Sequence, residues 1–321
     1  MNVQAIGISI GASNGYLSEL EKALDYAQAA GYQLVEIGIH DLNLILNGRL
    51  IPALSRSVQQ VMQRYDLRCT IHAPNRTNLA FGYDLPMDYA VLQACIEFCS
   101  VVDASVLVYH SGLQAIEYVR TGVYPMPSLE DMARGAAREV ESLQKIAPFA
   151  ADHGVTICME NGDPHLWEYR LMRANNKPDS DLPLYHPRLR IPPIVAQVQA
   201  VNHPNVAMTL DLAHLYLAAN AVPSFDYLEA VEQAAPVTRH LHLNDNFGKL
   251  DAGFEEGGVR APYGEADLHL PPGWGSIPIA EAFKRLAGFE GYLILELKAR
   301  YAEYFASARE TIEAMLADQE S

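Results

Sequence analysis

Short apolar runs alternate with longer amphipathic stretches along almost the whole chain. The runs are rich in Val, Ile and Leu and carry few charges, which is typical of parallel strands buried on both faces. We predict eight strands, at residues 3–10, 34–39, 68–72, 106–110, 155–160, 206–211, 240–244 and 292–296.

The stretches between these runs repeat apolar residues at helical spacing. The first places Leu20, Leu24 and Ala27 on one face and stops before Gly31, a residue type that commonly follows helices. Ser128 and Asp131 resemble a capping box at the start of another helix. The predicted helices cover residues 18–30, 51–65, 88–102, 128–154, 191–201, 227–234, 279–286 and 301–316.

Strand followed by helix, repeated eight times, predicts a single-domain α/β fold, the (β/α)8 or TIM barrel. The 321 residues, of which 50% are hydrophobic, are enough for one such barrel. Three strand-to-helix connections are long, at residues 111–127, 161–193 and 245–276. Long loops at the carboxyl ends of barrel strands commonly bind ligands. We expect the 161–193 insertion, which mixes aromatic residues, arginines and prolines, to cover the site as a lid.

Composition narrows the classes of function. The net charge of −16 disfavours general binding to nucleic acids or anionic membranes. The N-terminal sequence shows no signal peptide, and the longest apolar runs are too short to span a bilayer. Cys69, Cys95, Cys99 and Cys158 form no CxxC pair and fit a core in a reducing compartment. We therefore expect a cytoplasmic protein with a small-molecule partner and, by analogy with other barrels, a homodimer.

Histidine and carboxylate side chains stand at the strand ends and in the loops that follow them. Parallel strands in a ring bring such groups to one rim, where buried charges need partners. Histidine and carboxylates without cysteine suit Zn, Mn, Mg or Co. We predict one to three divalent metal ions per chain, with nine candidate ligands: His72, His110, Glu160, Asp211, His214, His242, Asp267, His269 and Glu296.

The remaining histidines lack this placement at strand ends. We expect them to be structural or surface residues, and we expect His240 to point away from His242. They are His40, His153, His165, His186, His203 and His240.

Several segments resemble the xylose isomerase-like TIM-barrel superfamily, which includes sugar isomerases, epimerases and endonuclease IV. Those similar to endonuclease IV are HAPNRTNLA (72–80), TLDLAH (209–214), HLND (242–245) and DLHLPPGWG (267–275), with MEN around Glu160 and LEL around Glu296. The resemblance implies that all nine ligand types of its three-zinc site recur here in order. Asn75 replaces the tyrosine that helps endonuclease IV to engage distorted DNA. That replacement, the long insertion and the acidic surface favour a small substrate over duplex DNA.

Two activities follow from the resemblance. Sugar isomerases and epimerases commonly hold one metal with Glu, Asp, His and Glu, which correspond to Glu160, Asp211, His242 and Glu296. The two glutamates would then be the catalytic acid and base. In the alternative, the other ligands hold further ions and the enzyme hydrolyses a phosphoester. The complete set of nine ligand types favours this alternative, as does Asn244 of HLND, because many isomerase-like relatives have a lysine at that position.

We favour isomerisation or epimerisation of a sugar or sugar phosphate slightly over hydrolysis. A non-catalytic sugar sensor is a third interpretation, without positive support. The candidate substrate contacts are His214, Arg76, Arg173, Lys298 and Arg300.

Overall fold

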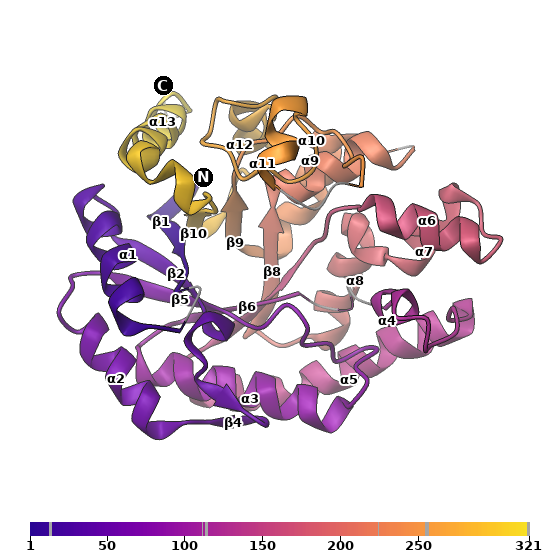
Figure 1. Cartoon of the computed structure of the whole chain (residues 1–321), viewed down its shortest axis with the longest axis horizontal. Helices are drawn as coiled ribbons and strands as arrows, with labels where there is room; N and C mark the ends of the chain where they lie inside the picture. Colours follow the sequence, from indigo (N-terminus) through magenta and orange to yellow (C-terminus); the bar gives the residue numbers. More distant parts are fainter. Residues whose placement is uncertain (13–14, 111, 113–114, 224, 254–256, 320–321) are drawn as a thin grey trace.

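Eight parallel strands close into a barrel, in the order β1-β10-β9-β8-β7-β6-β5-β2. The computed structural model describes residues 1–12, 15–110, 112, 115–223, 225–253 and 257–319. Each barrel strand overlaps one predicted strand, so the predicted TIM barrel is confirmed (Figure 1). The strands are β1 (Asn2–Ile10), β2 (Leu34–Gly38), β5 (Arg68–His72), β6 (Val106–Tyr109), β7 (Thr156–Glu160), β8 (Val206–Asp211), β9 (Thr238–Leu243) and β10 (Glu290–Leu295).

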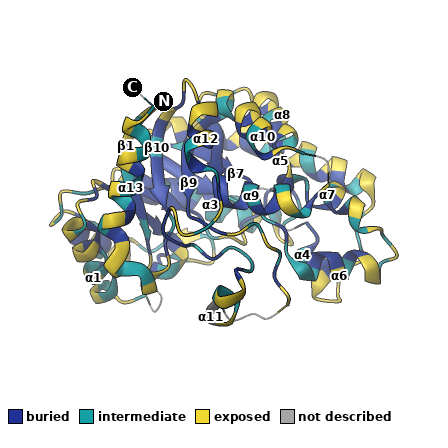
Figure 2. Ribbon diagram, turned by 90° about the horizontal axis from the view of Figure 1, so that it is seen from above, coloured by how far each residue is buried: buried dark blue, intermediate teal, exposed yellow. Residues whose placement is uncertain are grey.

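The predicted helices surround this barrel, with their exposed faces outward and the strands buried inside (Figure 2). Ser128 and Asp131 form the predicted capping box, because the Asp131 N–H donates to Ser128 Oγ at 3.1 Å and the Ser128 N–H to Asp131 Oδ2 at 2.8 Å. The helices are α1 (Leu17–Ala29), α2 (Pro52–Met62), α3 (Leu85–Val101), α5 (Leu129–Asp152), α8 (Ile191–Val201), α10 (Tyr227–Ala234), α12 (Ile279–Arg285) and α13 (Phe305–Ala317).

The structure adds elements that the pattern did not predict. The helix α9 (Leu212–Ala221) follows β8 directly, and its sequence LAHLYLAANA is apolar on nearly every side, so no polar face marks its period. The long connections contain α4 (Glu117–Arg120), α6 (Leu166–Ala174), α7 (Leu182–Tyr185) and α11 (Gly257–Arg260). Also present are the hairpin β3 (Ile45–Leu46) and β4 (Arg49–Leu50) and the 3-10 helices η1 (Ile39–Leu42), η2 (Asp179–Asp181), η3 (Pro187–Leu189), η4 (Ala235–Val237), η5 (Ala261–Tyr263) and η6 (Ala299–Tyr304).

The barrel interior changes from apolar to polar along the strands. Residues two apart on a strand share a face, so Cys158 lies below Glu160 on β7, and Ala207 lies below Asp211 on β8. The register between neighbouring strands places polar residues at the same height in the barrel, because Asp211 of β8 pairs with His242 of β9. The packed apolar lower layers therefore support a buried polar layer at the carboxyl rim.

The 161–193 insertion is anchored to the outer helices by a buried ion pair. Arg188 of η3 places its Nη2 2.5 Å from Glu139 Oε2 of α5, and the Tyr109 hydroxyl donates to Glu139 Oε1 at 3.0 Å. All three side chains are almost fully buried. Parts of the other two long connections, residues 111, 113–114 and 254–256, lie outside the described residues. Within the described part of the chain, no helix is long and apolar enough to cross a membrane.

Candidate metal centre and active site

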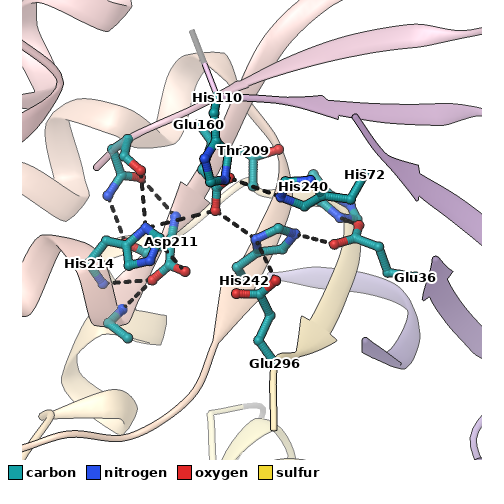
Figure 3. Close-up of polar contacts among 12 residues, drawn as sticks. Glu36, His72, His110, Glu160, Thr209, Asp211, His214, His240, His242 and Glu296 are labelled. Carbon is teal, nitrogen blue, oxygen red and sulfur yellow. Dashed lines mark hydrogen bonds and ion pairs between the residues drawn. The ribbon is translucent and has the colours of Figure 1, made fainter. Parts of the chain in front are cut away.

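Glu160, the last residue of β7, lies at the centre of the polar rim and is only 1% exposed. Its Oε2 lies 2.5 Å from His110 Nε2 and 3.5 Å from His72 Nε2. Its Oε1 lies 2.8 Å from His242 Nδ1 (Figure 3). The ends of four strands therefore meet at one carboxylate, as the ring of parallel strands predicts.

A second set of contacts joins Glu160 to Asp211, His242 and Glu296. His242 Nδ1 lies 3.5 Å from Glu296 Oε1, and each of the four residues offers a ligand atom within 4.8 Å of the others. Asp211 also caps α9, because its Oδ1 accepts the N–H groups of Ala213 and His214 at 2.7 Å. Its Oδ2 is buried and has no hydrogen-bond partner among the described residues.

The other three predicted ligands extend this cluster. Asp267 Oδ2 lies 2.7 Å from His269 Nε2 and 3.6 Å from His214 Nε2. His269 Nδ1 lies 2.7 Å from the Glu296 carbonyl oxygen, and His269 has a φ of 49°, an unusual conformation for a residue other than glycine. A hydrogen bond from Nδ1–H to that carbonyl directs Nε2 toward Asp267. The structure thus brings all nine predicted residues into one connected group.

Two buried carboxylates of the group, Glu160 and Asp211, have pKa values shifted in opposite directions. Burial opposes ionisation of Glu160, but His110 and His242 hold its pKa well below the usual range. Burial raises the pKa of Asp211 to about 7, and the carboxylates of Glu296 and Glu160 add to the rise against the opposing effect of His214. Asp267 Oδ1, like Asp211 Oδ2, is buried without a hydrogen-bond partner among the described residues. These crowded carboxylates and imidazoles fit divalent metal ions.

Glu36 of β2 belongs to the same network and was not predicted. Its Oε1 lies 2.8 Å from His242 Nε2, and its Oε2 lies 2.8 Å from His240 Nε2 (Figure 3). Glu36 Oε2 also accepts the Thr70 hydroxyl at 2.9 Å. The expectation that His240 points away from His242 is wrong, because residues two apart on a strand share a face. A sequence signal existed, since Glu36 is the one charged residue in the apolar strand LVEIG.

A cavity of about 680 Å³ opens beside this cluster. His110, His214, Asp267 and His269 line one part of it. The insertion lines another part through Asp163, His165, Trp167, Glu168, Arg170 and His186. His165 and His186, expected to be structural or surface residues, therefore line the cavity. Their position was not predicted, because the spacing of residues in the sequence does not show how the insertion folds back.

The predicted substrate contacts are distributed differently. His214 lines the cavity, whereas Arg76 lines a neighbouring pocket. Arg173 Nε donates to Asp179 Oδ1 at 2.9 Å on the exposed surface of the insertion, away from the described cavity lining. Lys298 and Arg300 are exposed and follow β10, and they too are absent from the described cavity lining. The arginines that do line the cavity are Arg120, Arg170 and Arg260, one from each long connection.

The chain belongs to the family described as "Xylose isomerase-like TIM barrel", whose model matches residues 24–318. This match confirms the resemblance that the motifs indicated. The uncharacterised protein Rv0498 of Mycobacterium tuberculosis is 36% identical over 112 residues, which cover 34% of this chain. The chain thus matches only 31% of the length of this curated relative.

Solved structures share the fold at low sequence identity. A D-tagatose 3-epimerase-like protein superposes with a TM-score of 0.69 and 19% identity, over 98% of this chain and 97% of the other. A D-psicose 3-epimerase of Clostridium cellulolyticum gives a TM-score of 0.65 and 15% identity, over 98% and 99%. An L-ribulose 3-epimerase gives 0.63 and 16%, over 99% and 95%. At these identities the comparison establishes the fold.

Proposed function

We propose that this chain is a divalent-metal-dependent enzyme that isomerises or epimerises a small sugar or sugar phosphate. One observation carries the proposal: two strand-end carboxylates, Glu160 and Glu296, lie 2.8 and 3.5 Å from the same nitrogen, His242 Nδ1. Asp211 completes a group of four possible ligands. The names of the three solved structures described above, a D-tagatose 3-epimerase-like protein, a D-psicose 3-epimerase and an L-ribulose 3-epimerase, support the same class of reaction.

Glu160, Asp211, His242 and Glu296 would hold the catalytic ion. When bound, a divalent ion supplies polarisation of a sugar carbonyl and its neighbouring hydroxyl, which acidifies the C–H between them. One glutamate would take the proton from that carbon, and the other would deliver a proton to the adjoining position or to the opposite face. Glu160 is buried and Glu296 is partly exposed, so the two carboxylates differ in their access to solvent protons.

The insertion has a defined part in this proposal. Its residues line the cavity, and its Arg188–Glu139 ion pair fixes it to α5. We propose that residues 161–193 act as a cover that limits the size of the substrate and excludes water from the proton transfer.

A second candidate is hydrolysis of a phosphoester on a small substrate. It is favoured by a further group of possible ligands, His72 and His110 with Glu160. Asp267 Oδ2 also lies 2.7 Å from His269 Nε2 and 3.6 Å from His214 Nε2, next to this group. Additional ions there would supply activation of water and charge stabilisation at the leaving oxygen. One ion per chain favours proton transfer, whereas two or three ions favour hydrolysis.

Solvent deuterium exchange tests the proposal directly. The metal-loaded protein is incubated in D2O with a panel of ketoses and ketose phosphates, and deuterium at the carbons next to the carbonyl is measured by NMR. We expect incorporation with the wild type and its loss in Glu160→Gln and Glu296→Gln. The matched control Glu281→Gln, at an exposed position on α12, should retain exchange.

The opposing result is equally specific. Absence of exchange across the panel, together with phosphoester cleavage by protein that holds two or three ions, would replace the isomerase proposal with the hydrolase.

A further inference from the structure

Three arginines from three separate loops line the cavity that opens beside the candidate metal centre. Arg120 belongs to α4, Arg170 to α6 and Arg260 to α11. Figures 1 and 2 both place α4 close to α6. The proposed proton transfer uses none of these side chains, and the net charge of the chain is −16, so a general attraction to anions does not account for them.

Neighbouring groups hold in place the side of the cavity that carries Arg120, Arg170 and Arg260, which we call the arginine wall. The Arg120 guanidinium lies over the Trp167 ring, 5.0 Å from its centroid. Arg260 Nη2 lies 4.0 Å from Asp251 Oδ1, and Asp251 Oδ2 accepts the Leu166 N–H at 3.2 Å. The loops that carry α4 and α11 are thus both tied to the start of α6, which orders Arg120 and Arg260 before any ligand binds.

His186 adds a buried nitrogen to the same wall. The side chain is 2% exposed and lines the cavity, with its Nδ1 2.8 Å from Glu168 Oε1. Its Nε2 is buried and has no hydrogen-bond partner among the described residues. A buried nitrogen without a partner is costly unless a ligand uses it.

Three of the carboxylates that line the cavity, Asp163, Glu168 and Asp251, have partners within the protein. Glu168 Oε2 accepts the His165 N–H at 2.8 Å, and Asp163 Oδ2 lies 3.8 Å from His165 Nε2. Asp251 accepts the Leu166 N–H and contacts Arg260. These three carboxylates orient the histidines and the loop backbone on this side of the cavity.

We propose that Arg120, Arg170, Arg260 and His186 bind the phosphate group of a phosphorylated sugar whose carbon chain reaches the metal centre. A guanidinium pairs with two phosphate oxygens at once, and several guanidiniums can share the three terminal oxygens of a phosphate ester, whereas a carboxylate offers only two. The same cavity also contains His110 and Asp267, so one ligand can contact both ends. The claim that the carbon chain of the sugar reaches the metal centre rests on the proposed function, but the claim that the arginines bind phosphate does not.

Calorimetry with inorganic phosphate tests the wall. Phosphate is titrated into the full chain, both loaded with metal and treated with a chelator so that no metal contributes to binding. We expect binding in both states, about tenfold weaker in Arg170→Ala because a charge-assisted hydrogen bond is lost, and weaker also in Arg120→Ala. Arg173→Ala is the matched control, since Arg173 lies on the same helix but pairs with Asp179 outside the cavity. The affinity of this variant for phosphate should equal that of the wild type.

Two results would overturn the inference: no phosphate binding in either state, or equal affinities in Arg170→Ala and Arg173→Ala. Failure of this inference is distinguishable from failure of the proposed function. Deuterium exchange into an unphosphorylated ketose that is unaffected by Arg170→Ala would retain the enzyme class and remove the phosphate wall. Phosphate binding that depends on Arg170, in a protein without any exchange, would retain the wall and remove the isomerase.

Discussion

Replacing Glu36 with glutamine removes a buried charge that contacts His242 on the side away from Glu160 and Glu296. The carboxylate is fully buried, with Oε1 2.8 Å from His242 Nε2 and Oε2 2.8 Å from His240 Nε2. A carboxylate at Nε2 of a ligand histidine fixes the orientation of the ring and makes its other nitrogen a better ligand. Glu36 is therefore expected to be a positioning residue that directs His242 Nδ1 toward the proposed ion.

The size of the effect follows from this geometry. Loss of such an outer partner typically lowers metal affinity by about 10–100-fold, which corresponds to about 1.4–2.7 kcal/mol. Glutamine preserves the volume of the side chain, but its NH2 group cannot accept a hydrogen bond, so one of the two imidazoles or the Thr70 hydroxyl loses its acceptor. We expect the affinity to fall within this range while the fold is retained.

The assay is a chelator competition that measures the dissociation constant of the metal, with circular dichroism to confirm the fold. Thr70→Val is the control, because it removes one hydrogen bond to Glu36 and leaves the contact between Glu36 and His242 in place. Its metal affinity should change much less than that of Glu36→Gln. A folded Glu36→Gln variant that binds metal as tightly as the wild type would refute the reasoning.

Three further predictions follow. Metal affinity should fall as the pH is lowered from about 8 to 6, because burial raises the pKa of Asp211 to about 7 and its proton then competes with the ion; equal affinity across this range contradicts that view. His110→Ala should leave a single-ion isomerase partly active, but should remove an ion and nearly all activity from a multinuclear hydrolase, as metal analysis and turnover would show. Arg188→Ala should lower the free energy of unfolding in urea by about 3–5 kcal/mol, because Glu139 loses its buried partner, whereas Arg190→Ala, at an exposed position, should change it by less than about 0.5 kcal/mol.

The sequence was most informative where burial imposes a regular pattern. Parallel strands buried on both faces read as apolar runs, and a polar residue at the end of each run stood out, as Glu160 and Asp211 did. Glu36 was missed because it lies inside a strand, where a single charge can be mistaken for a surface position. The helix α9 was missed for the opposite reason, since a buried helix without a polar face has no visible period.

The loop residues were the hardest to predict. Arg173 and Arg170 lie one helical turn apart on α6, yet only Arg170 faces the cavity. Residues at this spacing share a face of the helix, so the two differ in how far the cavity extends along α6. That depends on how the insertion packs against α5 through contacts such as Arg188 with Glu139. Those contacts join residues 49 positions apart and leave no signal in the local spacing.

Anomalous diffraction from crystals grown with manganese or zinc gives the most direct test of the metal centre. We expect an ion bound by Glu160, Asp211, His242 and Glu296, at ligand distances of about 2.0–2.2 Å. A metal-replete crystal with no anomalous peak among these four side chains, or with ions bound only elsewhere on the molecule, would contradict it.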